Sequence, residues 1–529
     1  MADYRGAIQG LDALIERELG TFNAPGIAVG LTNRAATLHV GVYGLANRDA
    51  KIVIVPQTLF QIGSISKAFT SISLLQLHEQ GLLDIDEPVT RYLPWFELPS
   101  IYSPTTLRHL LSHTAGIITG ADDTLSAFSE AWNLRHSAAN APPGEFFHYS
   151  NSGYKVLGLV LQTILGAGMP EILRQQILNP LGMDSSEGAI TNRVRSRLAV
   201  GYEALYDDRP LPHGGPLVPA TWFESDTADG AICSTAEDMC HYLRALLTRG
   251  QGLLSPASFE QLISPMIATG DDLHGEHYGL GLFREQVDGR LVIGHSGGMV
   301  GYTADLLADL DSGLGVVVLT NGPAEPQRIS RYALQLLNAA HRGDELPPMP
   351  QSDPYFVVDA ESYAGRFRCG EKEFDLISGG EHLDLQMESD TVPVESHAPH
   401  GFYIPHAAFE MFLLRPEEGG FAHGPDFYIR EGVEPSEIQD YPPEWEAYPG
   451  HYRSHNPWLN NFRVVLRRGA LDLIYPSGEE EPLHHQDGAT FRVGPVPRSP
   501  ERLRFDMLIN GKAHQAELSG GAYCRTFTL

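Results

Sequence analysis

The stretch Ser64-Ile65-Ser66-Lys67 stands at the front of a long apolar run. Residues three positions apart in a helix lie on the same face, so this spacing brings the Ser64 hydroxyl within hydrogen-bonding reach of the Lys67 amine. The positive end of the helix lies beside that hydroxyl. A lysine that is kept from solvent and lies near another cation or dipole can lose its proton near neutral pH and act as a base. The stretch therefore predicts a buried helix that presents a serine nucleophile together with its base.

A sheet assembled from both ends of the segment 1–345 is expected around this helix. An amphipathic helix over 8–19, ended by Gly20, opens the segment, and a helix from about Pro326 to a stop at Gly343 closes it. The sequence from about 105 to 181 has a mostly helical pattern. The strand-like runs are 26–31, 37–43, 278–283, 290–293, 303–308 and 315–319. Because most of these runs are joined as hairpins, we expect an α/β (α+β) domain, with an antiparallel sheet flanked by helices and an all-helical subdomain on one side.

The clearest linker in the chain is Leu346-Pro347-Pro348-Met349-Pro350-Gln351-Ser352-Asp353-Pro354. Beyond it the sequence changes to short alternating runs with frequent turns. Tyr363-Ala364-Gly365-Arg366-Phe367-Arg368 is similar to Tyr448-Pro449-Gly450-His451-Tyr452-Arg453, and each opens a stretch of about the same length. We therefore expect two small all-β, barrel-like modules, over 354–440 and 441–529, after a first domain over 1–345.

Composition limits the possible partners and location. The formal net charge of −29 in 529 residues disfavours nucleic acid and anionic membrane surfaces as partners, because both would be repelled. Four cysteines without a C-x-x-C pair form no disulfide framework, and we expect neither a metal site nor a cofactor. The N-terminus lacks the pattern of a signal peptide, and no apolar run approaches a membrane span. A cytoplasmic protein of undetermined oligomeric state is the expectation.

Two further motifs carry polar groups suited to catalysis. In Tyr149-Ser150-Asn151, a phenol and a carboxamide two residues apart can point the same way, so that Tyr149 relays a proton and Asn151 holds a substrate amide or the lysine. His295-Ser296-Gly297-Gly298 follows the strand at 290–293, and its glycines would let a substrate backbone approach closely. The amide N–H groups of Ser64 and Gly298 could then form an oxyanion hole.

The order S-x-x-K, Tyr-x-Asn and His-Ser-Gly resembles the serine β-lactamases and penicillin-binding proteins, most closely the class C β-lactamase-like branch with its D-aminopeptidases, D-amino-acid amidases and carboxylesterases. The similarity spans residues 1 to about 345. Supporting phrases are 110–117 (LLSHTAGI), 179–183 (NPLGM) and 230–239 (GAICSTAEDM). The tail modules resemble the paired β-barrels attached to some D-aminopeptidases of this branch.

The resemblance implies residue roles. Ser64 would be the acylated nucleophile, Lys67 its base and Tyr149 the second proton-transfer group. Asn151, His295, Ser296 and Gly297 would contact the substrate, and Ser64 and Gly298 would hold the oxyanion.

One departure from the family pattern affects the substrate. Typical β-lactamases and cell-wall peptidases carry lysine in the third motif, where this chain has His295, which is mostly neutral at pH 7 if unperturbed. The prediction is therefore a serine hydrolase that acts on small peptides or amides, of the aminopeptidase or D-amino-acid type. A carboxylesterase or a weak β-lactamase is the alternative.

Other interpretations fit the sequence less well. Residues 294–298 also satisfy G-x-S-x-G, but a strand-like run follows Ser296 where an α/β-hydrolase elbow requires a helix. A trypsin-like site lacks the aspartate before the serine. His113 is expected to pack or hydrogen-bond the loop after its helix. A catalytically silent ligand-binding protein on this fold is the alternative from outside the enzymes.

Overall fold

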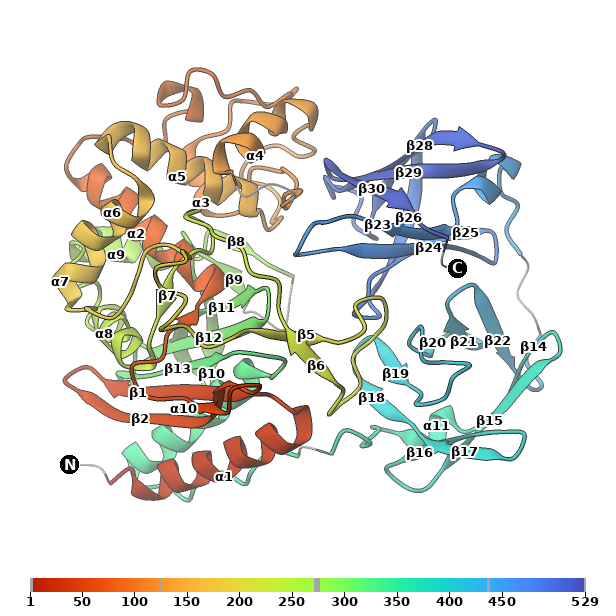
Figure 1. The fold of residues 1–529 in the computed structure, drawn as a ribbon. Coiled ribbons are helices and arrows are strands. Elements are labelled where there is room, and N and C mark those ends of the chain that lie inside the picture. The colour runs from red at the N-terminus through yellow and green to blue at the C-terminus, as the bar shows by residue number, and fades with distance from the viewer. Residues whose placement is uncertain (1–2, 123–125, 271–275, 352, 435–437, 528–529) are drawn as a thin grey trace. The chain divides into compact units, whose positions relative to one another are not determined.

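The structure is a computed structural model, and it describes residues 3–122, 126–270, 276–351, 353–434 and 438–527. The chain forms two compact units (Figure 1). The first unit comprises the residues up to Glu203 together with Leu217–Pro350. The second comprises Ala204–Pro216 and the chain from Gln351 onward. The change of unit at Pro350 falls within the predicted linker. The segment Ala204–Pro216, which leaves the first unit and is called the excursion below, has no counterpart in the division expected from the sequence.

The first unit is built on a nine-stranded antiparallel sheet, in the order β3-β2-β1-β13-β12-β11-β10-β9-β8. As predicted, both ends of the segment contribute strands. Their bounds are β1 Gly26–Asn33, β2 Thr37–Asn47, β3 Ile52–Val53, β8 Ile267–Ala268, β9 His277–Tyr278, β10 Phe283–Val287, β11 Arg290–Met299, β12 Tyr302–Asp309 and β13 Leu314–Thr320. Two short strand pairs are separate from the sheet: β4 Phe60–Gln61 with β7 Cys233–Ser234, and β5 Tyr202–Ala204 with β6 Leu217–Pro219.

Two strand predictions are wrong in detail. The run 278–283 is not one strand, because the chain reverses within it and Phe283 of β10 pairs with Tyr278 of β9. Gly281 has a φ of +96°, and a Cβ there would lie 2.4 Å from Ser71 Oγ, so a continuous strand does not fit. The strand at 290–293 runs on to Met299 because its pairing with β12 continues, so the His-Ser-Gly motif lies inside β11.

Helices cover both faces of this sheet (Figure 1). One face packs on α1 Arg5–Phe22 and α10 Pro326–Arg342, and the other packs on α2 Ser66–Glu79 and α8 Ala236–Leu247. The helix α10 ends at Gly343 in the left-handed conformation, as predicted. The helix α1 runs through Gly20 to a left-handed cap at Asn23, because Asn also tolerates that conformation.

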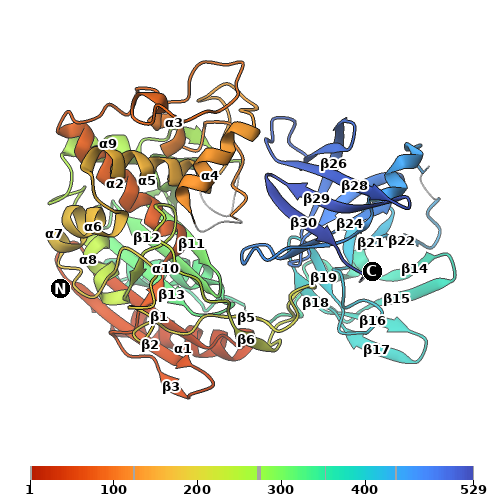
Figure 2. The ribbon, with the colours of Figure 1, turned by 45° about the horizontal axis from the view of Figure 1, so that its top comes forward.

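The helix α2 lies at the centre of the unit, as its all-round apolar sequence predicts. Eleven of its residues are buried, and the Phe69 ring stacks on Tyr242 of α8 with 4.0 Å between centroids. The mostly helical region beyond it forms the predicted helical part (Figure 2). Its elements are η2 Val89–Arg91, α3 Leu107–Leu111, α4 Ala127–Asn133, η3 Leu134–His136, α5 Asn151–Leu165, α6 Met169–Leu173, a π-turn at Arg174–Leu178 and α7 Asn179–Leu181, and α9 Pro256–Ile263 packs on α2.

Within the described residues, no single helix has the length and apolar character to cross a membrane. The pair Asn151–Leu165 and Met169–Leu181 passes that test only when combined, and it is bent by 78°.

The second unit contains two β modules with separate cores. The first is a seven-stranded sheet, in the order β17-β16-β15-β14-β22-β21-β20, with a two-stranded sheet β18-β19 and the short helix α11 Ala360–Tyr363. Its strands are β14 Gly365–Cys369, β15 Lys372–Ser378, β16 Leu383–Met387, β17 Asp390–Pro393, β18 Glu395–His397, β19 Gly401–Tyr403, β20 Arg415–Glu417, β21 Gly420–His423 and β22 Asp426–Arg430.

The second module is a closed eight-stranded barrel, preceded by the turn η5 Pro443–Ala447. Its strands are β23 Gly450–Arg453, β24 Asn461–Arg467, β25 Ala470–Ile474, β26 Glu480–Asp487, β27 Thr490–Val493, β28 Arg502–Ile509, β29 Lys512–Leu518 and β30 Gly521–Arg525. The two similar segments noted in the sequence occupy the same place in each module, because a helical turn leads into the first strand, whose aromatic Phe367 or Tyr452 is fully buried.

We predict that Phe69→Ala destabilises the first unit by about 3–5 kcal/mol, because it deletes a buried ring stacked in the centre of the fold. Urea unfolding of the full chain, followed by loss of native fluorescence, measures the change. Leu82→Ala is the matched control, since Leu82 is 52% exposed and should change the unfolding midpoint little. Equal effects of the two substitutions would contradict the central place of α2.

Candidate active site

The site begins at the tight turn that leads into α2. Ser64 lies in the 3₁₀ turn η1 Gly63–Ile65, directly before α2 rather than in its first regular turn. Gly63 has a φ of +54°, and a Cβ there would lie 2.7 Å from the main-chain N and O of Gly298. Only glycine therefore allows this turn to approach β11 so closely. The approach brings the main chain of Ser64 beside Gly297 and Gly298.

The side chains of Ser64 and Lys67 meet as the spacing predicts. Lys67 Nζ lies 2.9 Å from Ser64 Oγ, 2.8 Å from Asn151 Oδ1 and 3.1 Å from the carbonyl oxygen of Asp229. The three partners come from η1, from the start of α5 and from the loop before β7. They occupy the three donor positions of an ammonium, so the amine is held in one orientation.

Burial changes the protonation of this amine. Lys67 is fully buried, and burial lowers its pKa to about 8. The carboxylates of Asp229 and Asp122 oppose this shift, whereas the ammonium of Lys155 adds to it. A substantial fraction of Lys67 is therefore neutral just above pH 7, and a neutral amine at 2.9 Å can accept the Ser64 proton.

Tyr149 lies beside both groups. Lys67 Nζ is 4.8 Å from the centre of its ring, and the phenol takes part in a hydrogen bond with Ser64. Burial raises the pKa of Tyr149 far above its ordinary value, and the bond with Ser64 only partly offsets this. Tyr149 is thus a neutral phenol, able to donate a proton, while Lys67 is the group of the pair that titrates near neutrality.

The His113 ring packs against the Tyr149 ring. The two rings lie 4.2 Å apart, and His113 Nδ1 accepts a 3.0 Å hydrogen bond from the main-chain N–H of Ser150. Burial lowers the pKa of His113 well below its ordinary value, an effect strengthened by Lys67. The imidazole is therefore neutral and contributes packing and one accepted hydrogen bond, in line with the packing function expected from the sequence.

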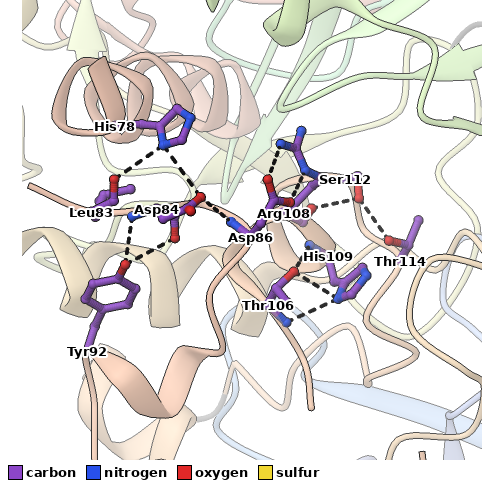
Figure 3. Close-up of polar contacts among 10 residues, drawn as sticks. All are labelled: His78, Leu83, Asp84, Asp86, Tyr92, Thr106, Arg108, His109, Ser112 and Thr114. Carbon is purple, nitrogen blue, oxygen red and sulfur yellow. Dashed lines mark hydrogen bonds and ion pairs between the residues drawn. The ribbon is translucent and has the colours of Figure 1, made fainter. Parts of the chain in front are cut away.

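The segment that carries His113 is fixed through α3 (Figure 3). Thr106 caps the helix together with His109, and Arg108 forms a two-pronged ion pair with Asp86. Ser112 Oγ donates to the Arg108 carbonyl at 2.8 Å. Side chains at both ends of α3 thus hold the turn in which His113 has a φ of +56°.

The strand β11 closes the opposite side of the site. Alternation along the strand puts His295 and Gly297 on the sheet face that packs on α2, and a Cβ at Gly297 would lie 3.2 Å from the Ser64 nitrogen. Pairing with β10 ends at Gly294, and Gly298 is exposed. This edge can therefore accept an extended substrate backbone beside the N–H groups of Ser64 and Gly298.

The side chain of Ser296 is not placed with these groups. Ser296 pairs directly with Asp305, whose carboxylate accepts a hydrogen bond from Ser330 of α10. Directly paired residues share a face of the sheet, so Ser296 lies on the α10 side, where it borders a small cavity of about 20 Å³. The side chain of Ser296 thus lies on the opposite face of the strand from His295 and Gly297, and its expected contact with the substrate stays a prediction.

His295 is engaged within the protein. Its Nδ1 lies 2.6 Å from the main-chain oxygen of Ser296, and its Nε2 lies 3.0 Å from the Tyr278 hydroxyl. A carbonyl oxygen only accepts, so Nδ1 carries a proton, whereas the direction of the bond between Nε2 and Tyr278 depends on the protonation of the ring. Both ring nitrogens of His295 are therefore engaged within the protein.

Charged residues that sequence reasoning missed surround Asn151. Asp122 accepts from Lys155 in a buried ion pair and, at 3.4 Å, from Asn151 Nδ2. Asp229 is buried as well, and no hydrogen bond to its Oδ1 is found among the described residues. One signal was available, since Lys155 follows Asn151 by four residues and so shares its helix face.

These features define a class of protein: one in which a serine hydroxyl and a buried lysine amine meet at the start of a central helix, between an antiparallel sheet and a helical subdomain. The chain belongs to the Beta-lactamase family, whose model matches residues 11–340.

Relatives agree with this assignment. Protein Flp of Staphylococcus aureus (strain NCTC 8325 / PS 47) is 26% identical over 346 residues, which span 62% of this chain and 66% of Flp. Among solved structures, the octameric penicillin-binding protein homologue from Pyrococcus abyssi is 23% identical, with a TM-score of 0.60 over 88% of this chain and 98% of that one. The D-amino acid amidase from Ochrobactrum anthropi SV3 is 23% identical, with a TM-score of 0.53 over 64% and 99%. At these identities the two structures establish the fold.

We predict opposite shifts in the pH dependence of the reaction of Ser64 with a fluorophosphonate when the buried ion pair is altered. Lys155→Met removes a cation and should raise the pKa of Lys67, whereas Asp122→Asn removes an anion and should lower it. Shifts of about half to one pH unit are expected in the rate of labelling by a fluorophosphonate.

Lys51→Met is the matched control, because Lys51 is an exposed lysine of the same unit. Shifts of the same sign in both buried variants would mean that the pair acts only through folding.

Proposed function

We propose that the protein is a serine hydrolase that acts through an acyl-enzyme on Ser64, and that its substrates are small peptides or amides with a free amino group. The observation that carries the proposal is the 2.9 Å contact between Ser64 Oγ and a fully buried Lys67 whose pKa is about 8. Family membership and the helix-flanked sheet support it.

The mechanism follows from the geometry of these groups. Neutral Lys67 takes the proton of Ser64 as Oγ attacks the substrate carbonyl. The N–H groups of Ser64 and Gly298 stabilise the oxyanion, and each such donor is typically worth about 3 kcal/mol. The Tyr149 phenol then protonates the leaving amine and recovers its proton from Lys67, so that the tetrahedral intermediate collapses to an ester of Ser64. Water, deprotonated by the same pair, hydrolyses this ester and restores the Ser64 hydroxyl.

The charges beside the site support a cationic substrate. Two buried amines, those of Lys67 and Lys155, lie in this region. Three carboxylates interact electrostatically with one or both of them: Asp122, Glu130 and Asp229. Both ring nitrogens of His295 are engaged within the protein, by Tyr278 and Ser296, and are not directed at a substrate carboxylate. A substrate ammonium near Asp229 would be favoured, and a carboxylate-bearing β-lactam or cell-wall peptide disfavoured. The shared fold with a D-amino acid amidase supports an amide substrate by analogy. A cytoplasmic location remains part of the proposal.

A covalent label tests the nucleophile. A fluorophosphonate should modify Ser64, as located by peptide mass spectrometry, and Ser64→Ala should abolish both the label and turnover. Ser296→Ala is the matched control, because its side chain lies on the far face of the sheet, and this variant should keep most of the label. Loss of the label in Ser296→Ala with retention in Ser64→Ala would refute the assignment.

A substrate panel tests the class of substrate. L- and D-amino acid p-nitroanilides with a free amine should be hydrolysed at least about tenfold faster, in kcat/KM, than their N-acetylated forms, because a charge is lost beside the carboxylates. p-Nitrophenyl esters and nitrocefin complete the panel. Faster turnover of the N-acetylated or ester substrates would favour the esterase alternative.

The pH profile tests the base. Lys67 accepts a proton only when neutral, so kcat/KM for a p-nitrophenyl ester, whose own charge does not change with pH, should rise about tenfold per pH unit at acidic pH and level off above about pH 8. Tyr149→Phe should lower the plateau and leave the position of this rise in place. A profile that is flat from pH 6 to 9 would contradict Lys67 as the titrating base.

A further inference from the structure

Three side chains of metal-binding type meet in the second unit, far along the chain from Ser64. His213 comes from the excursion Ala204–Pro216, and Glu395 and His397 come from β18. Glu395 Oε1 lies 2.5 Å from His213 Nδ1 and 2.7 Å from His397 Nε2. The ligand atoms of all three residues lie within 4.8 Å of one another.

The strand holds two of these groups in place. Glu395 and His397 are two residues apart in β18 and therefore point to the same side. They pair with Tyr403 and Gly401 of β19. His213 is fixed from the other side, because its main-chain N–H also donates to Glu395 Oε1 at 2.7 Å. The imidazole rings of His213 and His397 meet edge to face, with 5.4 Å between centroids.

The carboxylate is buried and charged. The Glu395 side chain is only 5% exposed, and the two imidazoles are 18% and 17% exposed. Burial by itself raises the pKa of Glu395, but the hydrogen bonds from His213 and His397 lower it to about 2. Two imidazole nitrogens are thus directed at one oxygen of a buried carboxylate.

We propose that His213, Glu395 and His397 bind a zinc ion. Two imidazole nitrogens and one carboxylate oxygen are a ligand set that Zn²⁺ accepts, and a fourth position remains for water. Neighbouring ligand atoms of tetrahedral zinc lie about 3.4 Å apart, so Glu395 must retreat by less than about 1 Å from its hydrogen-bonded position, and the two imidazole nitrogens, within 4.8 Å of each other, must approach by at most about 1.4 Å. The ion replaces the protons that His213 Nδ1 and His397 Nε2 share with Glu395, and these protons move to the other ring nitrogen or to solvent.

The place of this site in the chain suggests what the ion does. The excursion is already held by charges: Asp208 pairs with Arg463 at 3.2 Å and Arg209 with Glu410 at 2.7 Å. These contacts hold its first half, and His213 lies in its second half. A zinc ion at His213 anchors that second half to β18 and closes the excursion at both ends.

Metal titration tests the proposal on the full chain after treatment with EDTA. One Zn²⁺ per chain should bind in competition with a chromophoric chelator. Co²⁺ in its place should give the visible absorption of a four- or five-coordinate ion with nitrogen and oxygen ligands. Zinc should also slow hydrogen exchange in residues 204–216. His397→Ala and, independently, Glu395→Gln should weaken zinc binding at least about a hundredfold.

His382→Ala is the matched control, because His382 also pairs with a carboxylate of this unit, Asp353, at 2.8 Å, but is more exposed. This variant should bind zinc as the wild type does, and so should Ser64→Ala. Sub-stoichiometric zinc with no Co²⁺ absorption in the wild type would overturn the proposal, even if a variant failed to fold. Equal weakening in His382→Ala and His397→Ala would also overturn it.

Discussion

The structure depends most on the burial of one amine. Lys67 lies in α2, fully removed from solvent, and a charged group is costly there unless it is paired or loses its proton. The protein does both in part: three oxygen atoms accept from the amine, and burial lowers its pKa to about 8. Its partners come from three separate segments, so the helical subdomain and the loop before β7 must pack correctly for the amine to be satisfied.

The charges around Asn151 extend this constraint. Asn151 links two buried ion systems, because its oxygen accepts from Lys67 and its nitrogen donates to Asp122, which pairs with Lys155. Each buried charge in this network is compensated by a neighbour, and removal of any one leaves another uncompensated. The same network sets the pKa of the candidate base. Stability and reactivity are therefore coupled through the same few side chains.

The second unit also contains a buried cation that is compensated by neighbouring oxygen atoms. Arg467 of the barrel is almost fully buried, and it donates to Glu480 at 2.6 Å, to Asp472 at 3.1 Å and to the Gly424 carbonyl at 2.7 Å. The last contact reaches the first module, so a buried cation joins the two β modules into one unit. Charged side chains of the excursion form ion pairs with the same unit. Ala204–Pro216 therefore belongs to the second unit and not to the unit of its neighbours in sequence.

The sequence by itself determined the central helix, the contribution of both ends of the segment to one sheet and the pairing of Ser64 with Lys67, because these depend on local periodicity and on residues three positions apart. It also predicted the all-β structure after Pro354, through turns and alternating runs, although only the second module closes into a barrel. Tertiary structure decided the remainder. Strand alternation in β11 put Ser296 on the face opposite His295, and a chain reversal at Gly281 divided a predicted strand. Asp122, Asp229 and Lys155 came together around Asn151, as did His213 and Glu395 in the second unit. Such groups lie far apart in the chain, and both their proximity and their desolvation arise only when the segments that carry them pack together.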